Sequence, residues 1–303
     1  MAVEAQRAPR PAPLVLFARR RPGVATSGLI GPPVLWLVLL FVVPVGIAVV
    51  YSLGVLSFFP GEAKFSFSAW KGFLDWSSYL QLFVKRSLKV AVWVSIASVI
   101  LAYPVAYFLA LCTTRRKYTL LLLIVTPAFV SYFLRLLAMK TVLGDNGLLN
   151  TIAYSLGRNQ DHPIPQLIYS QTAVIVTLVF VYVPFVALPI FVSLENLDRR
   201  LLEAASDLGA TRRQAFWRVT FKLSLPGVIA GFVFVFIPTL GEYFTPLIVG
   251  GTTGFLFGNS ISDLFGPSLD WQTGSVLSIF LVVVVVVLMA VFARFLSLKR
   301  VAG

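Results

Sequence analysis

The sequence predicts an all-α, polytopic membrane protein with six transmembrane helices, and three observations lead to that fold class. Hydrophobic residues make up 58% of the 303-residue chain and charged residues only 12%, whereas soluble domains carry about a quarter charged residues. The apolar residues gather into six long runs. The basic residues lie in short clusters between those runs. So much apolar surface is expected to face lipid rather than water.

Each run is long enough to cross the hydrocarbon core, which requires ~20 apolar residues in a helix. The predicted spans are Val34–Leu53, Val90–Cys112, Tyr118 to about Leu143, Thr172–Leu194, Leu223 to about Val249, and Gly274–Ala293. Helices are expected because a segment in lipid must pair its own backbone groups. A barrel strand would instead alternate polar and apolar residues over about ten positions, and these runs are continuous.

The Lys and Arg residues predict the orientation of the spans. With the N-terminus in the cytoplasm, most of the 25 basic residues fall in the termini and in the loops after the second and fourth spans. The loop 250–273, on the other side, has none. Cytoplasmic loops carry this excess, so we expect both termini in the cytoplasm. Lys85, Arg86 and Lys89 fall on the outer side and are not explained by this rule.

The chain is expected to divide into four parts: an N-terminal cytoplasmic tail (1–27), a first transmembrane helix with an outer loop (28–86), a transmembrane core (87–296) and a C-terminal tail (297–303). The core contains the cytoplasmic loop 195–225. Although the net charge is +13, the basic residues are split among the loops, so a nucleic-acid partner is not expected. No metal or cofactor site is expected either, because the single histidine, His162, has no ligand cluster at suitable spacing.

The polar segment 195–227, ENLDRRLLEAASDLGATRRQAFWRVTFKLSLPG, is the most informative part of the sequence. We expect two short helices in it. Asp198 can cap the first, and Gly209 suits its left-handed C-terminal cap. Thr211 and Gln214 have capping-box spacing for the second. Such an amphipathic element can insert into a groove on a partner or lie on lipid headgroups.

The string EAASDLGATRRQAFWRVTFKLSLPG resembles the EAA loop of binding-protein-dependent ABC importer permeases. The residues that match the family's positions are Glu203, Ala204, Ala205, Gly209, Phe216, Val219, Pro226 and Gly227. Phe221-Lys222 stand where the family usually has Leu-Pro, which leaves the entry angle of the fifth span open. Pro226-Gly227 is expected to mark the return of the chain into the membrane.

The resemblance extends from about residue 85 to 296. RSLKVAVWVSIASVILAYPVAYFLA, TPAFVSYFLRLLAMKTVLGDNGLLN and GEYFTPLIVGG are similar to the second, third and fifth spans of the spermidine/putrescine-type branch. The resemblance implies a type I ABC importer permease fold in the inner membrane. The implied substrate is a polyamine such as spermidine or putrescine, although another small amine, an aminophosphonate, an opine or iron remains open.

The resemblance also implies the partners of the chain. The residues implied to dock on a cytoplasmic ATP-binding subunit, as the coupling helix, are Glu203, Ala204, Ala205, Asp207 and Gly209. The chain has no GxxxxGK[ST] phosphate loop, so hydrolysis of ATP is expected in that partner and the chain is not expected to be an enzyme. The family implies two copies of the ATPase, a second homologous permease chain and a periplasmic substrate-binding protein.

Arg135 and Glu242 are charges inside the predicted spans, where a charge usually has a partner or lines a polar pathway. In straight helices they lie roughly 25 Å and 24 Å from the cytoplasmic side. They are expected either to form an ion pair or to line the substrate pathway. Glu242, with Tyr243 and Tyr132, suits a cationic amine through charge and cation–π attraction. If Arg135 pairs with Glu242, the role of the glutamate is structural.

Two other classes of membrane protein compete with the importer. An ion-coupled secondary transporter would place acids or broken helices near the midplane, where these spans are almost free of charge, and would leave the segment 195–227 unexplained. A membrane enzyme would need a catalytic constellation of side chains, which one histidine in a loop does not supply.

Overall fold

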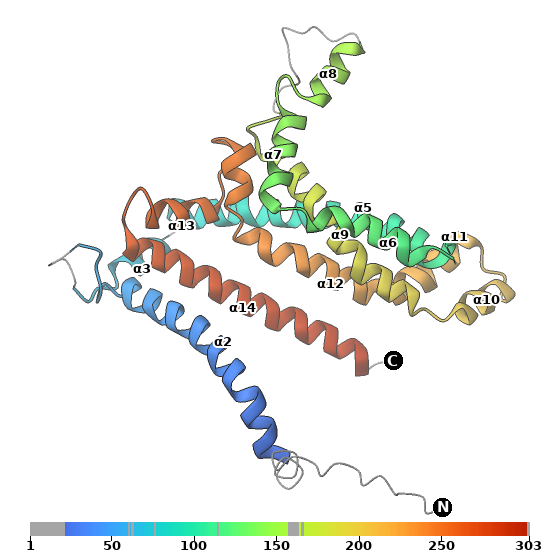
Figure 1. The fold of residues 1–303 in the computed structure, drawn as a ribbon, viewed down its shortest axis with the longest axis horizontal. Helices are drawn as coiled ribbons and strands as arrows, with labels where there is room; N and C mark the ends of the chain where they lie inside the picture. The colour runs from blue at the N-terminus through green and yellow to red at the C-terminus, as the bar shows by residue number, and fades with distance from the viewer. Residues whose placement is uncertain are drawn as a thin grey trace, which may run out of the picture.

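A computed structural model describes residues 22–59, 61, 64–75, 77–113, 115–156, 164 and 167–301. The predicted tail (1–27) lies outside the described residues up to position 21, and so does His162. Within the described ranges the chain forms helices and loops, with no strand (Figure 1). The predicted all-α fold class is therefore confirmed.

The long helices are α2 (Pro22–Ser52), α5 (Leu88–Tyr107), α9 (Gln171–Glu195), α12 (Phe221–Leu240) and α14 (Trp271–Val301). The shorter ones are α3 (Ser68–Leu74), α4 (Ser78–Leu82), α6 (Lys117–Val125), α7 (Tyr132–Leu143), α8 (Leu148–Ser155), α10 (Arg199–Asp207), α11 (Arg212–Ala215) and α13 (Phe257–Phe265). Wider π-helical turns continue or join them at η1 (Phe83–Ser87), η2 (Phe108–Cys112), η4 (Phe216–Thr220) and η5 (Pro246–Gly250), and η3 (Thr126–Phe129) is a tighter 3₁₀ turn.

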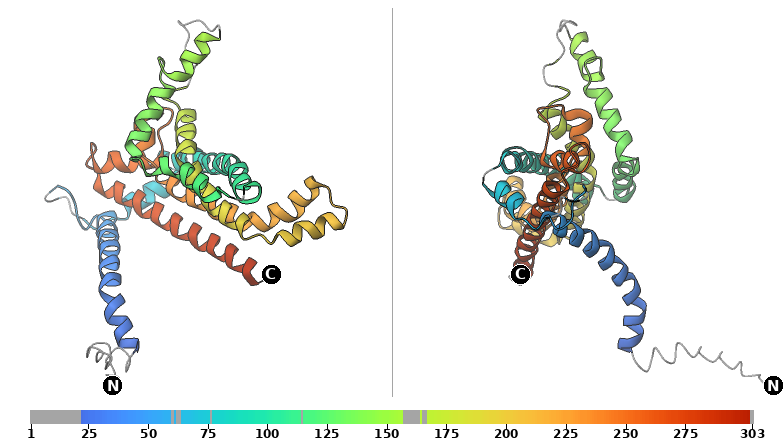
Figure 2. Two further views of the ribbon diagram at one scale, coloured as in Figure 1. Left: turned by 45° about the vertical axis from the view of Figure 1, so that its right-hand side comes forward. Right: turned by 90° about the vertical axis from the view of Figure 1, so that its left-hand side faces the viewer.

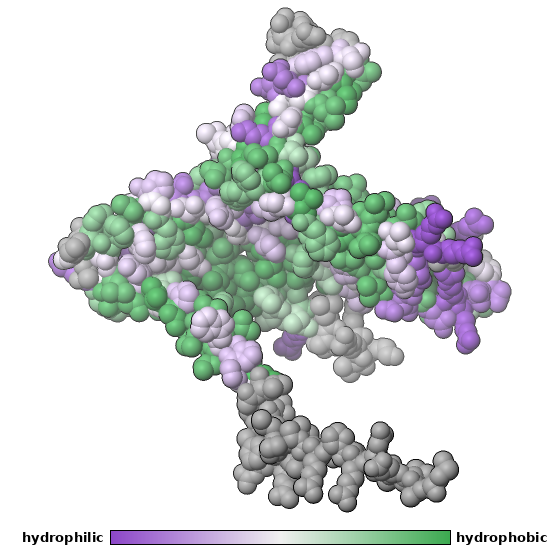
Figure 3. Space-filling model, in the orientation of Figure 1, coloured by the Kyte–Doolittle hydropathy of each residue, from purple (hydrophilic) through white to green (hydrophobic). Residues whose placement is uncertain are grey.

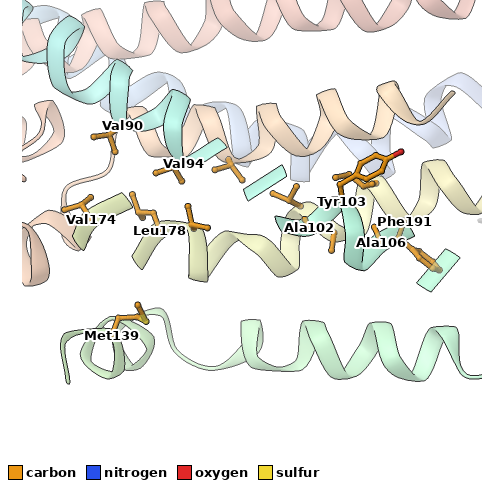
Figure 4. Close-up of a cluster of buried hydrophobic side chains, with 14 of the residues drawn as sticks. Val90, Val94, Ala102, Tyr103, Ala106, Met139, Val174, Leu178 and Phe191 are labelled. Atoms are coloured by element: carbon orange, nitrogen blue, oxygen red, sulfur yellow. The ribbon is translucent and has the colours of Figure 1, made fainter. Parts of the chain in front are cut away.

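Helices α5, α9 and α12 pack against one another along their lengths and form the centre of the bundle. Val90 and Val94 of α5 meet Val174 and Leu178 of α9 in a fully buried cluster (Figure 4). Small residues let membrane helices approach closely. Gly227 of α12 is such a residue, because a Cβ added there would lie 2.4 Å from the carbonyl oxygen of Pro189 in α9.

Five helical segments are long and apolar enough to cross a membrane: Ile30–Ser52, Ser78–Cys112, Gln171–Glu195, Arg212–Leu240 and Trp271–Arg294. A sixth crossing results if the bent pair Lys117–Phe129 and Tyr132–Ser155 is one span. Apolar side chains cover the flanks of the bundle, and hydrophilic ones gather at the end that carries α10 and α11 (Figure 3). This distribution fits the six-span membrane protein that the sequence predicts.

The third span differs from the prediction of one helix from Tyr118 to about Leu143. The chain leaves helical geometry at Val130 and Ser131, whose backbones are extended, and α7 departs at 88° to the preceding helix. Pro127 contributes to the break because it lacks a backbone donor. Helices α7 and α8 therefore project sideways from the bundle (Figures 1 and 2), and the depth calculated for Arg135 from a straight helix is wrong.

The fifth span also differs from its predicted limits of Leu223 and about Val249. Helix runs without interruption from Arg212 through η4 to Leu240, so Pro226 lies inside it and no break in the helix accompanies the predicted return of the chain into the membrane. Membrane helices accommodate proline when neighbouring groups pair the freed carbonyl. At the other end α12 stops at Leu240, so Glu242 follows this helix and does not lie within it.

Candidate functional site

The loop between α9 and α12 contains the predicted first helix, α10, with both of its predicted caps. Asp198 Oδ1 accepts a hydrogen bond from the Arg200 amide at 3.0 Å. Gly209 has a φ of +80°, and the amides of Gly209 and Ala210 donate to the carbonyls of Ser206 and Ala205 at 2.9 and 3.0 Å. These two bonds are the Schellman pattern, which gives α10 a fixed end.

The predicted capping box of the second helix is also present. The Gln214 amide donates to Thr211 Oγ1 at 3.4 Å, and the Thr211 amide donates to Gln214 Oε1 at 2.9 Å. The second helix is not a separate short element, however, because α11 passes through η4 into α12. Only the short turn at Gly209 therefore separates α10 from a helix of 29 residues, Arg212–Leu240.

The candidate coupling residues form an accessible surface. Glu203, Ala204, Asp207 and Gly209 are exposed and Ala205 is half-buried. No side chain of α10 is buried. This surface lies at the hydrophilic end of the bundle (Figure 3), which is the geometry that a docking helix requires.

An ion pair that the sequence analysis did not identify supports this end of the bundle. Lys117, at the start of α6, pairs with Glu195, the last residue of α9. The two residues are 78 positions apart, so no local sequence pattern could have linked them. The pair fixes the point at which the chain leaves α9 for α10.

Three of the four candidate pathway residues, Tyr132, Glu242 and Tyr243, line one cavity of about 340 Å³. Pro238, Gly241 and Phe244 complete its lining. Tyr132 comes from α7, and the others come from the end of α12 and the residues that follow it. The break in the third span is therefore what brings Tyr132 to Glu242.

Glu242 caps the short helical segment that begins at Phe244. Its Oε1 accepts hydrogen bonds from the amides of Phe244 and Thr245 at 3.1 and 2.9 Å. Tyr132 joins the same group, since its hydroxyl lies 2.6 Å from Thr245 Oγ1. A carboxylate has about four acceptor sites, so Glu242 can hold this cap and still accept a bond from a ligand in the cavity.

Arg135 does not pair with Glu242. Its guanidinium lies 5.7 Å from the centre of the Tyr132 ring and donates to the Val181 carbonyl at 3.4 Å. It lines a different, apolar cavity of about 650 Å³ between α5, the α6–α7 segment and α9. Tyr132 thus touches both groups, with its ring against Arg135 and its hydroxyl in the Glu242 cap.

Two residues that the sequence analysis did not identify hold the segment after Glu242 in place. Thr245 is buried and joins the Glu242 cap to Tyr132. Asn259 of α13 donates to the Tyr243 carbonyl at 2.8 Å and accepts from the Leu256 amide at 3.0 Å. Neither residue stands out in the sequence, because a threonine or asparagine in a loop has many ordinary uses. In the part of the chain that the structure describes, no cluster of His, Cys, Asp and Glu could hold a metal ion.

Comparison with known families gives a match over most of the chain. Residues 26–301 match the family described as the inner membrane component of binding-protein-dependent transport systems. The spermidine/putrescine transport system permease protein PotB of Escherichia coli is 36% identical over 209 residues, which cover 69% of this chain and 75% of that protein. PotB of Haemophilus influenzae is 36% identical over 211 residues, covering 70% and 73%.

Solved structures show the same fold. A bacterial ABC transporter involved in the import of the acidic polysaccharide alginate superposes with a TM-score of 0.74 at 15% identity, covering 96% of this chain and 100% of that chain. The bacterial alginate ABC transporter in complex with its pentasaccharide-bound periplasmic protein gives 0.72 at 14% identity, covering 93% and 96%. At these identities the likeness describes the fold alone.

Proposed function

Because the chain belongs to the family of inner membrane components of binding-protein-dependent transport systems, we propose that it is the permease of an ATP-driven importer for a polyamine such as spermidine or putrescine. The observation that carries the substrate proposal is the cavity of Tyr132, Glu242 and Tyr243, in a chain 36% identical to spermidine/putrescine permeases. The chain itself performs no chemistry on ATP in this proposal.

The cavity has the chemistry that an organic cation needs. Glu242 supplies a negative charge, and the rings of Tyr132, Tyr243 and Phe244 surround it. Cation–π attraction contributes about 0.5–2 kcal/mol for each well-placed ring. A polyamine carries several ammonium groups along its length, so one carboxylate can bind them one after another without holding the whole molecule tightly. Arg135 supports Tyr132 from the other side in this proposal and does not contact the substrate.

A partner ATPase supplies the energy. We propose that Glu203, Ala204, Ala205, Asp207 and Gly209 dock α10 into a groove on a cytoplasmic ATP-binding subunit. The Schellman end of α10 and the continuous helix Arg212–Leu240 then carry the movement of that subunit into the bundle. The accessible face of α10 and the absence of a phosphate loop from the sequence support this division of labour.

The assembly is proposed to contain two ATP-binding subunits, a second homologous permease chain and a periplasmic substrate-binding protein. Both termini of this chain lie in the cytoplasm in that arrangement, with 28–86 providing the first crossing and its outer loop and 87–296 the core. The excess of Lys and Arg at the end that carries α10 supports the orientation.

Other cargoes within the same importer role are small amines, aminophosphonates, opines and iron. The carboxylate of Glu242 favours cationic amines among them, because a phosphonate would meet like charge in the cavity. A secondary transporter is not favoured, since the family relies on a binding protein and the α10 surface would have no use.

The test is ATP-dependent uptake by the complete transporter in proteoliposomes. The substrate-binding protein is supplied on the side of the bilayer, inside or outside the vesicle, to which its docking face on the transporter is exposed. We expect labelled spermidine or putrescine to accumulate and 2-aminoethylphosphonate not to. Uptake that proceeds without ATP would overturn the importer proposal. Uptake of the phosphonate in place of polyamines would overturn the substrate proposal alone.

A further inference from the structure

Lys85 and Arg86 of η1 and Lys89 of α5 form a group that we call the outer cationic patch. The turn η1 contacts α13, which lies at the end of the bundle opposite α10 (Figure 1). All three side chains are exposed. Lys85 donates to Gln81 Oε1 at 3.2 Å and Arg86 donates to the Thr252 carbonyl at 3.4 Å. None of the three forms an ion pair with a carboxylate of the described residues. Their charge is therefore available to a partner.

The topology of the chain does not account for this patch. Basic residues are normally enriched on the cytoplasmic side, and the patch lies at the other end. The negative surface potential that attracts basic clusters to lipid also belongs to the cytoplasmic leaflet. A soluble partner with acidic side chains is consequently the occupant that fits the charge best.

A hollow of about 400 Å³ borders the patch, and its walls include Tyr79, Lys85, Arg86, Phe255 and Ser260. Cations, two aromatic rings and hydroxyl groups line the same space. Carboxylate side chains form their strongest hydrogen bonds with such charged donors, above all with the fork of an arginine. The hollow is large enough to receive side chains from a docked protein surface.

The backbone under the patch is a π turn, η1, and turns of this kind occur frequently at functional sites. Two side chains of the turn reach the same neighbouring segment. Arg86 bonds to the Thr252 carbonyl, and the buried Ser87 Oγ accepts from the Phe257 amide at 2.8 Å. The π turn therefore holds both ends of the segment between η5 and α13.

That segment continues directly from the candidate substrate cavity. Glu242 caps the helical residues that run through η5 to Gly250, and Thr252 follows two residues later. The turn at Gly251 has a φ of +55°, and a Cβ there would meet the Tyr169 carbonyl at 2.8 Å. Arg86 is thus linked to the cavity through its hydrogen bond to Thr252 and the short stretch of main chain between Thr252 and Glu242.

We propose that the outer cationic patch is a docking surface for an acidic face of the substrate-binding protein, and that Arg86 transmits docking to the segment that follows Glu242. This inference rests on the proposed function, because it requires a binding-protein-dependent importer. Charges at the rim of an interface act chiefly on the association rate and on its salt dependence. The patch accordingly speeds the association of the substrate-binding protein, and Arg86 passes the effect of docking to the segment that follows Glu242.

The docking test uses the complete transporter in nanodiscs of phosphatidylcholine, which remove anionic headgroups, and its purified, fluorescently labelled substrate-binding protein. The variant is Lys85→Glu with Lys89→Glu. The matched control is Lys64→Glu with Lys71→Glu, two exposed lysines at the same end of the bundle but outside the patch. We expect the patch variant to associate about tenfold more slowly at low salt, with the difference disappearing at high salt.

The outcomes separate this inference from the proposed function. If the wild-type transporter does not bind the receptor at all, the proposed function fails. If the wild type binds and the patch variant associates as fast as the wild type, or no more slowly than the control variant, the docking surface is disproved. The proposed importer function is then unaffected. If the patch variant changes only the lipid that copurifies with the transporter, the patch belongs to headgroups and the inference is equally overturned.

The transmission step has its own test. Arg86→Lys keeps the positive charge but shortens the reach to the Thr252 carbonyl. We expect receptor binding within about twofold of the wild type and a several-fold smaller stimulation of ATP hydrolysis by the loaded receptor. An unchanged stimulation would remove Arg86 from the route, and a loss of binding in parallel with stimulation would reduce its role to docking.

Discussion

At the scale of single residues, Glu242 has two roles that its sequence position could not distinguish. Its carboxylate caps the segment from Phe244 through two hydrogen bonds, and it also faces the cavity with Tyr132 and Tyr243. The cap needs an acceptor oxygen, whereas the proposed attraction of a cation needs a charge. Glutamine supplies the first without the second, so substitution can separate the two roles.

For Glu242→Gln we expect polyamine uptake to fall about tenfold or more with little change in thermal stability, because an amide oxygen can still accept the two backbone bonds. For Glu242→Ala we expect the same loss of uptake and a further destabilisation of about 1 kcal/mol from the lost cap. Uptake in proteoliposomes and thermal unfolding in detergent measure the two quantities. Equal uptake by Glu242→Gln and wild type would assign the glutamate to the cap alone.

Lys117 and Glu195 link two elements near the coupling loop, and their pairing is partly shielded from solvent. Among the described residues Glu195 Oε2 is buried without a hydrogen-bond partner, so removal of Lys117 would leave the whole carboxylate uncompensated. We expect Lys117→Gln to lower the free energy of unfolding of the protein by about 1–3 kcal/mol. The double variant with Glu195→Gln should recover much of that loss. A double-mutant cycle of thermal stability checks the coupling, and additive effects would contradict it.

At the scale of elements, two glycines of α12 lie against α9, Gly227 and Gly231, and Gly227 leaves less room for a Cβ. A Cβ on Gly227 would lie 2.4 Å from the Pro189 carbonyl oxygen and 2.5 Å from Ser193 Cβ. The main chain of α9 cannot yield as a flexible side chain can, so the two helices would have to separate.

We expect Gly227→Ala to destabilise the chain by about 1–3 kcal/mol or more through overpacking. Gly46→Ala in α2 is the matched control, because no atom of the described part of the chain lies within 4 Å of a Cβ added there and alanine is the better helix former. Thermal unfolding of both variants in detergent measures the difference. Similar melting temperatures for the two would show that the close approach of α9 and α12 is not a constraint.

At the scale of the whole molecule, α10 and the loop that precedes α14 lie at opposite ends of the bundle (Figure 1). The proposed orientation puts α10 in the cytoplasm and that loop outside. The chain has one cysteine, Cys112, and it is exposed, so it must be replaced before accessibility can be measured.

In a Cys112→Ser background we expect Ser268→Cys to react with a membrane-impermeant maleimide in whole cells, and Leu208→Cys to react only after the membrane is opened. Both positions are exposed, Leu208 at 89%, so the membrane and not burial decides the result. The reverse pattern would place α10 outside, where no cytoplasmic ATPase could reach it, and would overturn the coupling proposal.

The amino-acid order was enough to predict the features that depend on local interactions. Run length and polarity specified the spans, since a helix in lipid satisfies its own backbone. The caps at Asp198, Gly209 and Thr211 were predictable because each involves residues within a few positions of one another. The candidate cavity was only partly predictable: the sequence identified Glu242 and Tyr132 as residues of interest but placed them in straight spans.

The positions at which those spans break, and the residues beside the breaks, depend on the packing of the whole bundle. Pro127 and Pro226 have the same local chemistry, yet one coincides with an 88° bend and the other lies inside a continuous helix. The difference depends on neighbouring helices, which can either pair the freed backbone groups or leave the chain to turn. For the same reason the separation of Arg135 from Glu242 followed from the path of α7 and not from the order of residues.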